Sequence, residues 1–80
     1  MMLYNRYYYT CTQVIAEITR IRNWYTESYG GYVDFYHPVF QIFDKAISPI
    51  IDELDFKTQY TKTDLDEIIK RTYAACNNAV

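Results

Sequence analysis

The chain has 80 residues, of which 50% are apolar and 22% charged, with a formal net charge of −2. This length predicts one small helical domain over 1–80, and the apolar content is too high for a disordered chain. There is no apolar run of the roughly 18–20 residues that span a bilayer and no basic face, so composition excludes a membrane protein and argues against direct binding to nucleic acid.

Residues 3–29 show the clearest helical periodicity. At 100° per residue, one face collects the apolar side chains Leu3, Tyr4, Tyr7, Cys11, Val14, Ile15, Ile18, Ile21, Tyr25 and Tyr29. The pair Gly30-Gly31 ends the helix, because glycine readily adopts positive φ. The run from Tyr7 to Thr10 favours a strand locally, so the alternative is a helix that begins after a cap at Thr10 or Thr12.

A second helix is predicted over 38–55, because Pro38 suits a first helical turn and His37 a turn or cap before it. Its apolar face comprises Tyr36, Val39, Phe40, Phe43, Ala46, Ile47, Ile50, Ile51 and Leu54. Pro49 removes a backbone hydrogen bond and predicts a kink. Ser48-Pro49 offers the start of a separate short helix as the alternative, but the apolar face stays in phase across it.

A third helix is predicted over 64–77, with Thr63 as its N-cap, after a polar link over 56–62. Its apolar stripe comprises Leu65, Ile68, Ile69, Thr72 and Cys76, with Tyr73 at the edge. The sequence therefore predicts an all-α fold, a small three-helix bundle with a long first helix and a Pro-kinked second helix. Part of the first helix is expected to project beyond a monomeric core.

Two cysteines, Cys11 and Cys76, fall on these apolar faces. Residues 1–10 show no signal-peptide pattern, which predicts a cytoplasmic protein with free buried thiols rather than one disulfide. Buried thiols and a single histidine, His37, do not indicate nucleophilic catalysis. Zinc needs about four ligands, and no glycine-rich phosphate loop occurs, so we expect no enzyme activity, catalytic residue, cofactor or metal.

Tyrosine is unusually frequent, at ten residues beside four Phe and one Trp. Core packing accounts for the tyrosines that keep the apolar phase, but not for a stripe on the outer side of the first helix: Tyr9, Gln13, Arg20 and Trp24. Tyr, Trp and Arg dominate binding hot spots, so this stripe is a predicted partner-binding surface. The structural alternative is a stray surface aromatic, or a contact between Arg20 and Trp24 one turn apart.

Acidic residues gather around the link between the second and third helices. Residues 34–69 hold eight acidic side chains against three lysines. Six of the acids flank the link: Asp52, Glu53, Asp55, Asp64, Asp66 and Glu67. A short link brings the two groups near each other, which favours an acidic patch presented to a basic partner. Plain solvated surface is the alternative.

Together the two surfaces predict a small protein–protein interaction module, an inhibitor or adaptor that occludes a site on a larger protein with a basic surface. Phage and mobile-element chains of this size, including inhibitors of host nucleic-acid machinery, often act in this way, which is an argument from size and class. The alternative is a structural or assembly protein that forms a homodimer or larger homo-oligomer through the long first helix.

Overall fold

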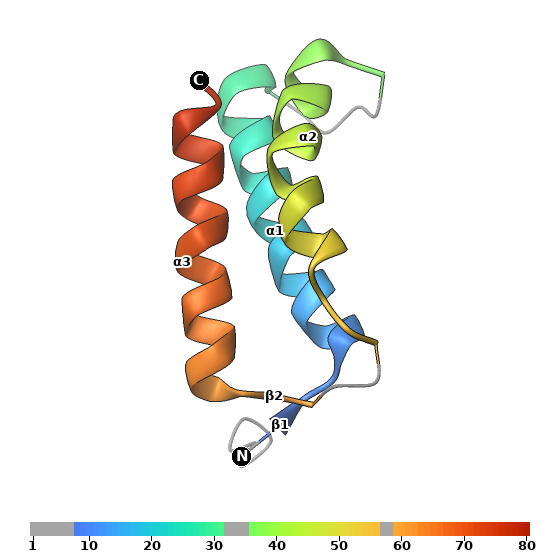
Figure 1. Ribbon diagram of the computed structural model, residues 1–80. Coiled ribbons are helices and arrows are strands. Elements are labelled where there is room, and N and C mark those ends of the chain that lie inside the picture. Colours follow the sequence, from blue (N-terminus) through green and yellow to red (C-terminus); the bar gives the residue numbers. More distant parts are fainter. Residues whose placement is uncertain (1–7, 32–35, 57–58) are drawn as a thin grey trace, which may run out of the picture.

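The computed structural model describes residues 8–31, 36–56 and 59–80. Three helices pack side by side: α1 (Cys11–Gly30), α2 (Pro38–Asp52) and α3 (Lys62–Asn78). Two short strands, β1 (Tyr8–Tyr9) and β2 (Tyr60–Thr61), form an antiparallel pair at one end of the bundle (Figure 1). The chain runs along α1, returns along α2 and runs back along α3, so α1 and α3 both end at the other end of the bundle (Figure 1). The predicted three-helix bundle is confirmed.

The first helix begins later than the predicted 3–29. Tyr8 and Tyr9 pair with Thr61 and Tyr60 as strands. Thr10 then caps α1: its hydroxyl accepts a hydrogen bond from the Gln13 backbone N–H at 3.2 Å, and the Gln13 side chain accepts one from the Thr10 N–H at 2.8 Å. Because this reciprocal box satisfies two backbone donors, the helix begins at Cys11, and the helical prediction for Tyr8 and Tyr9 is wrong. The predicted core residues Leu3, Tyr4 and Tyr7 lie outside the described residues.

The second helix begins as predicted and ends earlier. The His37 ring accepts a hydrogen bond from the Val39 N–H at 3.1 Å, which makes His37 the cap before Pro38. The helix continues through Pro49, so no new helix begins at Ser48, while the bend expected there stays a prediction. It ends at Asp52 rather than at residue 55, because the chain leaves the helix in a final turn closed by the Leu54 N–H on the Ile51 carbonyl at 3.0 Å.

The third helix is capped by Thr61, and the predicted cap at Thr63 is wrong. The Thr61 hydroxyl accepts a hydrogen bond from the Asp64 N–H at 3.1 Å, and the Asp64 carboxylate accepts one from the Thr61 N–H at 3.1 Å. Asp64 stands three residues after Thr61, the spacing that a capping box needs. Thr63 therefore lies inside the first turn of α3.

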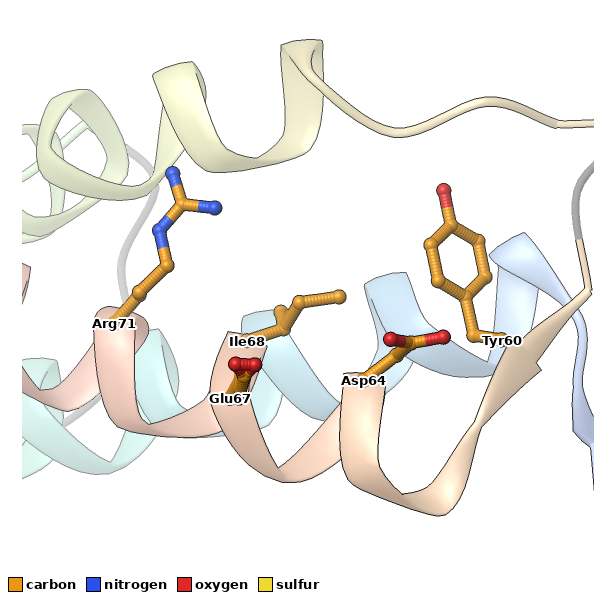
Figure 2. Close-up of a pocket in the computed structure, with 5 residues that line it drawn as sticks. All are labelled: Tyr60, Asp64, Glu67, Ile68 and Arg71. Carbon is orange, nitrogen blue, oxygen red and sulfur yellow. The ribbon is translucent and has the colours of Figure 1, made fainter.

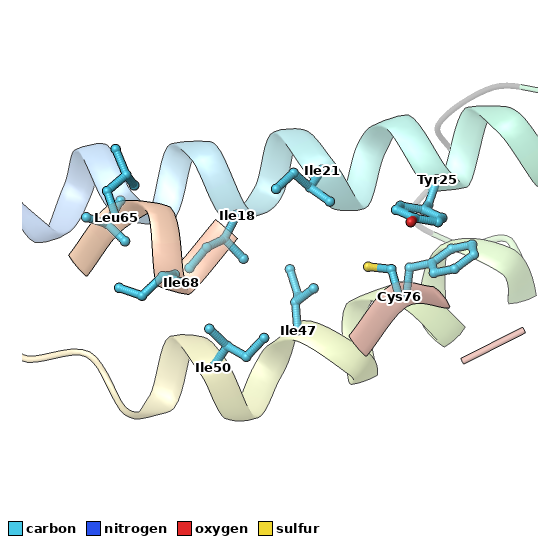
Figure 3. Packing of buried hydrophobic residues seen from close by; sticks show 10 residues of the cluster. Ile18, Ile21, Tyr25, Ile47, Ile50, Leu65, Ile68 and Cys76 are labelled. Carbon is cyan, nitrogen blue, oxygen red and sulfur yellow. The ribbon is translucent and has the colours of Figure 1, made fainter. Parts of the chain in front are cut away.

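The apolar core lies between the three helices (Figure 3). Its buried members are Val14, Ile18, Ile21, Tyr25, Phe43, Ile47, Ile50, Leu65, Ile68 and Cys76. Ile18 and Phe43 are 0% and 1% exposed, which confirms the central place predicted for each. Two predicted core positions are wrong. Tyr29 is 59% exposed because it lies in the last turn of α1, after the last buried residue of that helix, and Tyr36 is 89% exposed because it precedes α2.

The long first helix is covered along most of its length. Its buried residues run from Cys11 to Thr26, so among the described residues α1 does not project beyond the bundle as the sequence led us to expect. Beside the core, the Arg22 side chain pairs with Asp44 at 2.9 Å and stacks on Phe40 at 4.5 Å, which ties α1 to α2. Within the described ranges, none of the helices has the length and hydropathy needed to cross a membrane.

Candidate functional site

Five aromatic rings are linked by contacts near the end of the bundle where α1 and α3 end. The ring of Tyr25 lies 5.0 Å from Trp24, 5.3 Å from Phe43 and 6.2 Å from Tyr73, measured between centroids. Phe43 in turn lies 5.7 Å from Tyr29. These spacings and the non-parallel ring planes are those that aromatic pairs prefer. The five rings therefore form one packed cluster, contributed by all three helices.

The cluster has a buried base and an exposed rim. Tyr25 and Phe43 are buried, whereas Trp24, Tyr29 and Tyr73 are 58%, 59% and 44% exposed. We call these three exposed rings the aromatic surface. Trp24 immediately precedes Tyr25 on α1, so its side chain points about 100° away from that of Tyr25, to the side that leaves the core. Each exposed ring rests against a buried ring, so the surface is ordered before any partner arrives.

The base of the cluster is held by a hydrogen bond from the Tyr25 hydroxyl to the Asn77 side chain on α3. Burial raises the pKa of Tyr25, with smaller contributions from Cys76, Tyr73 and Tyr29, so the phenol remains a neutral donor. The buried Cys76 thiol lies in the same core, and burial raises its pKa to about 11. It therefore stays protonated at neutral pH and is a packing residue rather than a nucleophile.

The structure does not bring together the four residues of the predicted outer stripe. Tyr9 lies in β1 and packs partly buried against the core, and the Gln13 side chain belongs to the cap of α1. Arg20 pairs with Glu17 at 3.1 Å rather than resting on Trp24. The stripe assumed a helix through Tyr9, which the strand pairing overturns. Of the four residues, Trp24 and Arg20 are exposed on the outer side of α1.

Two residues of the aromatic surface were not predicted as partner-binding residues. Helical periodicity placed Tyr29 on the apolar face of the first helix. The signal that its side chain is exposed is its position in the last turn of α1, just before Gly30. Tyr73 was placed at the edge of the third apolar stripe, and its role depends on α3 lying beside α1 (Figure 1). Only the packed fold joins these two tyrosines to Trp24.

Several of the predicted acidic residues have partners, and the single acidic patch expected from the short link stays a prediction. Glu53, just after α2, pairs with Arg71 of α3 at 2.9 Å. Asp66 pairs with Lys62 one turn earlier on α3, at 3.3 Å, while Asp64 is engaged in the cap of that helix. These contacts are exposed, so each contributes little to stability.

Three other acids are exposed at the same end of the molecule. Asp52 ends α2, and Glu67 lies one turn after Asp64 on α3. Neither makes a hydrogen bond or ion pair with the residues that the structure describes. Asp55 donates its backbone N–H to the Tyr60 hydroxyl at 2.8 Å, so the segment after α2 is tied to the residue that leads into α3. The result is an acidic face that retains uncompensated carboxylates.

A pocket of about 320 Å³ opens on this acidic face. Its lining combines one apolar, one aromatic and three charged side chains: Tyr60, Asp64, Glu67, Ile68 and Arg71. Figure 2 shows Tyr60 and Arg71 at opposite ends, Asp64, Glu67 and Ile68 between them on α3, and the ribbon of α2 passing above. The pocket is therefore small and open, and its two carboxylates outnumber its one guanidinium.

Comparison of the chain with protein-family models, with curated proteins and with solved structures finds no match.

Proposed function

We propose that this chain is a small protein–protein interaction module, an inhibitor or adaptor, that occludes a site on a larger protein through its aromatic surface. The observation that carries the proposal is the exposure of Trp24, Tyr29 and Tyr73 on top of the buried pair Tyr25 and Phe43. Trp and Tyr supply much of the energy of interfaces. Because these rings are already packed on a fixed base, ordering them on binding costs little entropy.

Charge supports a partner with a basic surface. The carboxylates of Asp64 and Glu67 line the pocket on α3, and that of Asp52 is exposed at the end of α2. Opposite charges steer association and fix orientation more than they add affinity. The acidic face would accelerate the encounter, and the aromatic surface would hold the complex.

We also propose that the protein acts in the cytoplasm. Cys11 and Cys76 are both free buried thiols, and unpaired cysteines are typical of proteins that work in a reducing compartment.

The proposal is tested by affinity capture with matched variants. Partners captured by the wild-type chain are compared with those captured by Trp24→Ala/Tyr73→Ala and by the control Tyr8→Ala/Phe56→Ala. The control also removes two exposed aromatic rings, 58% and 75% exposed, from the opposite end of the bundle. An anchor contributes about 2 kcal/mol or more, so the first variant should lose at least about 30-fold in affinity for the captured protein.

The control variant should keep the affinity of the wild-type chain. Equal loss in both variants, or no loss in Trp24→Ala/Tyr73→Ala, would contradict the proposal, provided that thermal melting shows both variants folded. A molar mass measured by light scattering that shows a concentration-independent oligomer would instead favour the homo-oligomer alternative.

A further inference from the structure

The residues that line the pocket on the acidic face all come from β2 and α3, and the two at its ends contact the segment just after α2. At one end, the Arg71 guanidinium lies 2.9 Å from the Glu53 carboxylate, just after α2. At the other, the Tyr60 hydroxyl accepts a hydrogen bond from the Asp55 N–H at 2.8 Å. Figure 2 shows the side chain of Arg71 pointing toward the ribbon of α2 and that of Tyr60 pointing toward the chain that follows α2. The two contacts place the segment just after α2 beside both ends of the pocket.

The lining of the pocket offers three kinds of contact. Ile68 supplies an apolar floor and belongs to the core, and the ring of Tyr60 supplies an aromatic wall that is partly buried. Asp64 and Glu67 supply carboxylates one helical turn apart on the same face of α3. A cation with an apolar stem matches all three, because the stem covers the floor while the charge meets the wall and the carboxylates.

The electrostatic balance of the pocket is negative. The positive charge of Arg71 is offset by its partner Glu53. One oxygen of Asp64 accepts the Thr61 N–H, which leaves the second oxygen for a ligand. Glu67 is exposed and has no hydrogen bond or ion pair among the residues that the structure describes. Two carboxylates therefore face the opening without a compensating cation.

We propose that this pocket binds an arginine side chain of the partner protein, an inference that rests on the proposed function. The guanidinium plane stacks on Tyr60 and donates to the carboxylates of Glu67 and Asp64, while the aliphatic stem lies over Ile68. Arginine is favoured over lysine because its planar fork stacks and donates to two acceptors at once. The volume of about 320 Å³ lies at the lower limit of ligand pockets, which suits a single side chain.

The test uses short peptides and needs no identified partner. An acetylated and amidated Gly-Ser-Arg-Ser-Gly peptide is titrated into the isotope-labelled chain at low salt, and backbone amide shifts are followed by NMR. Peptides with citrulline or lysine in place of arginine serve as controls, since citrulline keeps the shape and loses the charge. The amides of Tyr60, Glu67 and Arg71 should shift most with arginine, weakly with lysine and least with citrulline.

A pair of variants with the same net charge locates the interaction. Glu67→Gln removes a pocket carboxylate, and Glu27→Gln removes an exposed carboxylate near the far end of α1. Glu67→Gln should lower the affinity for the arginine peptide by roughly threefold, which is the contribution of an exposed ion pair. Glu27→Gln should leave this affinity unchanged. Both carboxylates are exposed, so neither variant should change the melting temperature.

Three results would overturn the inference: equal weakening in both variants, equal shifts with citrulline, or equal binding of the lysine peptide. The first would show a diffuse charge effect, the second an apolar contact and the third a point-charge contact without stacking. Each failure is distinct from a failure of the proposed function, because the capture experiment depends on Trp24 and Tyr73 and the peptide experiment does not.

Discussion

Replacing Phe43 by alanine should bring the protein close to its unfolding threshold. Phe43 is 1% exposed and its ring contacts Tyr25 at 5.3 Å and Tyr29 at 5.7 Å. Truncating a buried Phe costs about 3–5 kcal/mol, and the two lost ring pairs place this change in the upper part of that range. A chain of 80 residues has a free energy of unfolding of roughly 4–12 kcal/mol, so the loss amounts to at least about a third of it and to all of it at the lower limit.

Urea denaturation followed by far-ultraviolet circular dichroism measures this loss. The matched control is Ile42→Ala, the preceding residue on α2, whose side chain is 44% exposed. It should cost less than about 1 kcal/mol, because its side chain is only partly removed from water. If Phe43→Ala unfolds at the same urea concentration as Ile42→Ala, the assignment of Phe43 to the centre of the core and to the base of the aromatic cluster is refuted.

Two further predictions concern the cap of α3 and the buried thiol. In the same urea assay, Thr61→Ala should lower the free energy of unfolding by about 1 kcal/mol, because Thr61 forms the capping box of α3. Thr63→Ala should lower it by less than about 0.5 kcal/mol. A larger loss for Thr63→Ala than for Thr61→Ala would contradict the observed cap. Burial raises the pKa of Cys76 to about 11 from an unfolded value near 9, and that of Tyr25 also rises. Since the unfolded state loses its protons first, stability should be constant below about pH 8.5 and fall as pH rises through about 9 to 11, by up to about 3 kcal/mol from Cys76. An unfolding free energy that stays unchanged from about pH 8 to 10.5 would contradict this.

Helical phase was sufficient to predict most of the core. Ile18, Phe43 and Leu65 each occupy the middle of an apolar face, and all three are buried. Periodicity works here because a buried position within a regular helix is set by local geometry. It fails at helix ends, where Tyr29 and Tyr36 kept the phase of the core and are exposed.

Features that depend on distant segments were harder to predict. Tyr8 and Tyr9 are strands because they pair with Thr61 and Tyr60, about fifty residues further along the chain. Tyr7-Tyr8-Tyr9 favours a strand locally, but pairing decides whether one forms. The cap at Thr61 was equally hard to select, since Asp64 stands three residues after Thr61 and Asp66 stands three residues after Thr63, so the capping-box spacing fits both threonines.

The candidate site was partly predictable for the same reason. Trp24 lies off the apolar face of α1, so its exposure follows from helical phase. Its neighbours on the aromatic surface follow from the packing of α1 against α2 and α3, which the sequence does not encode locally. The single patch expected of the acidic residues stays a prediction, and the pairing of Glu53 with Arg71 and the pocket beside it arise only in the folded chain.

The most direct test of the central claim is to observe Trp24 itself when a partner binds. Trp24 is the only tryptophan in the chain, so labelling with 5-fluorotryptophan gives a single ¹⁹F NMR resonance. In the free protein this resonance should show the solvent isotope shift of an exposed indole, in keeping with its 58% exposure. In the complex with the captured partner the resonance should move and lose that isotope shift. A resonance that keeps its position and its solvent isotope shift in the complex would contradict the proposal that the aromatic surface is the binding site.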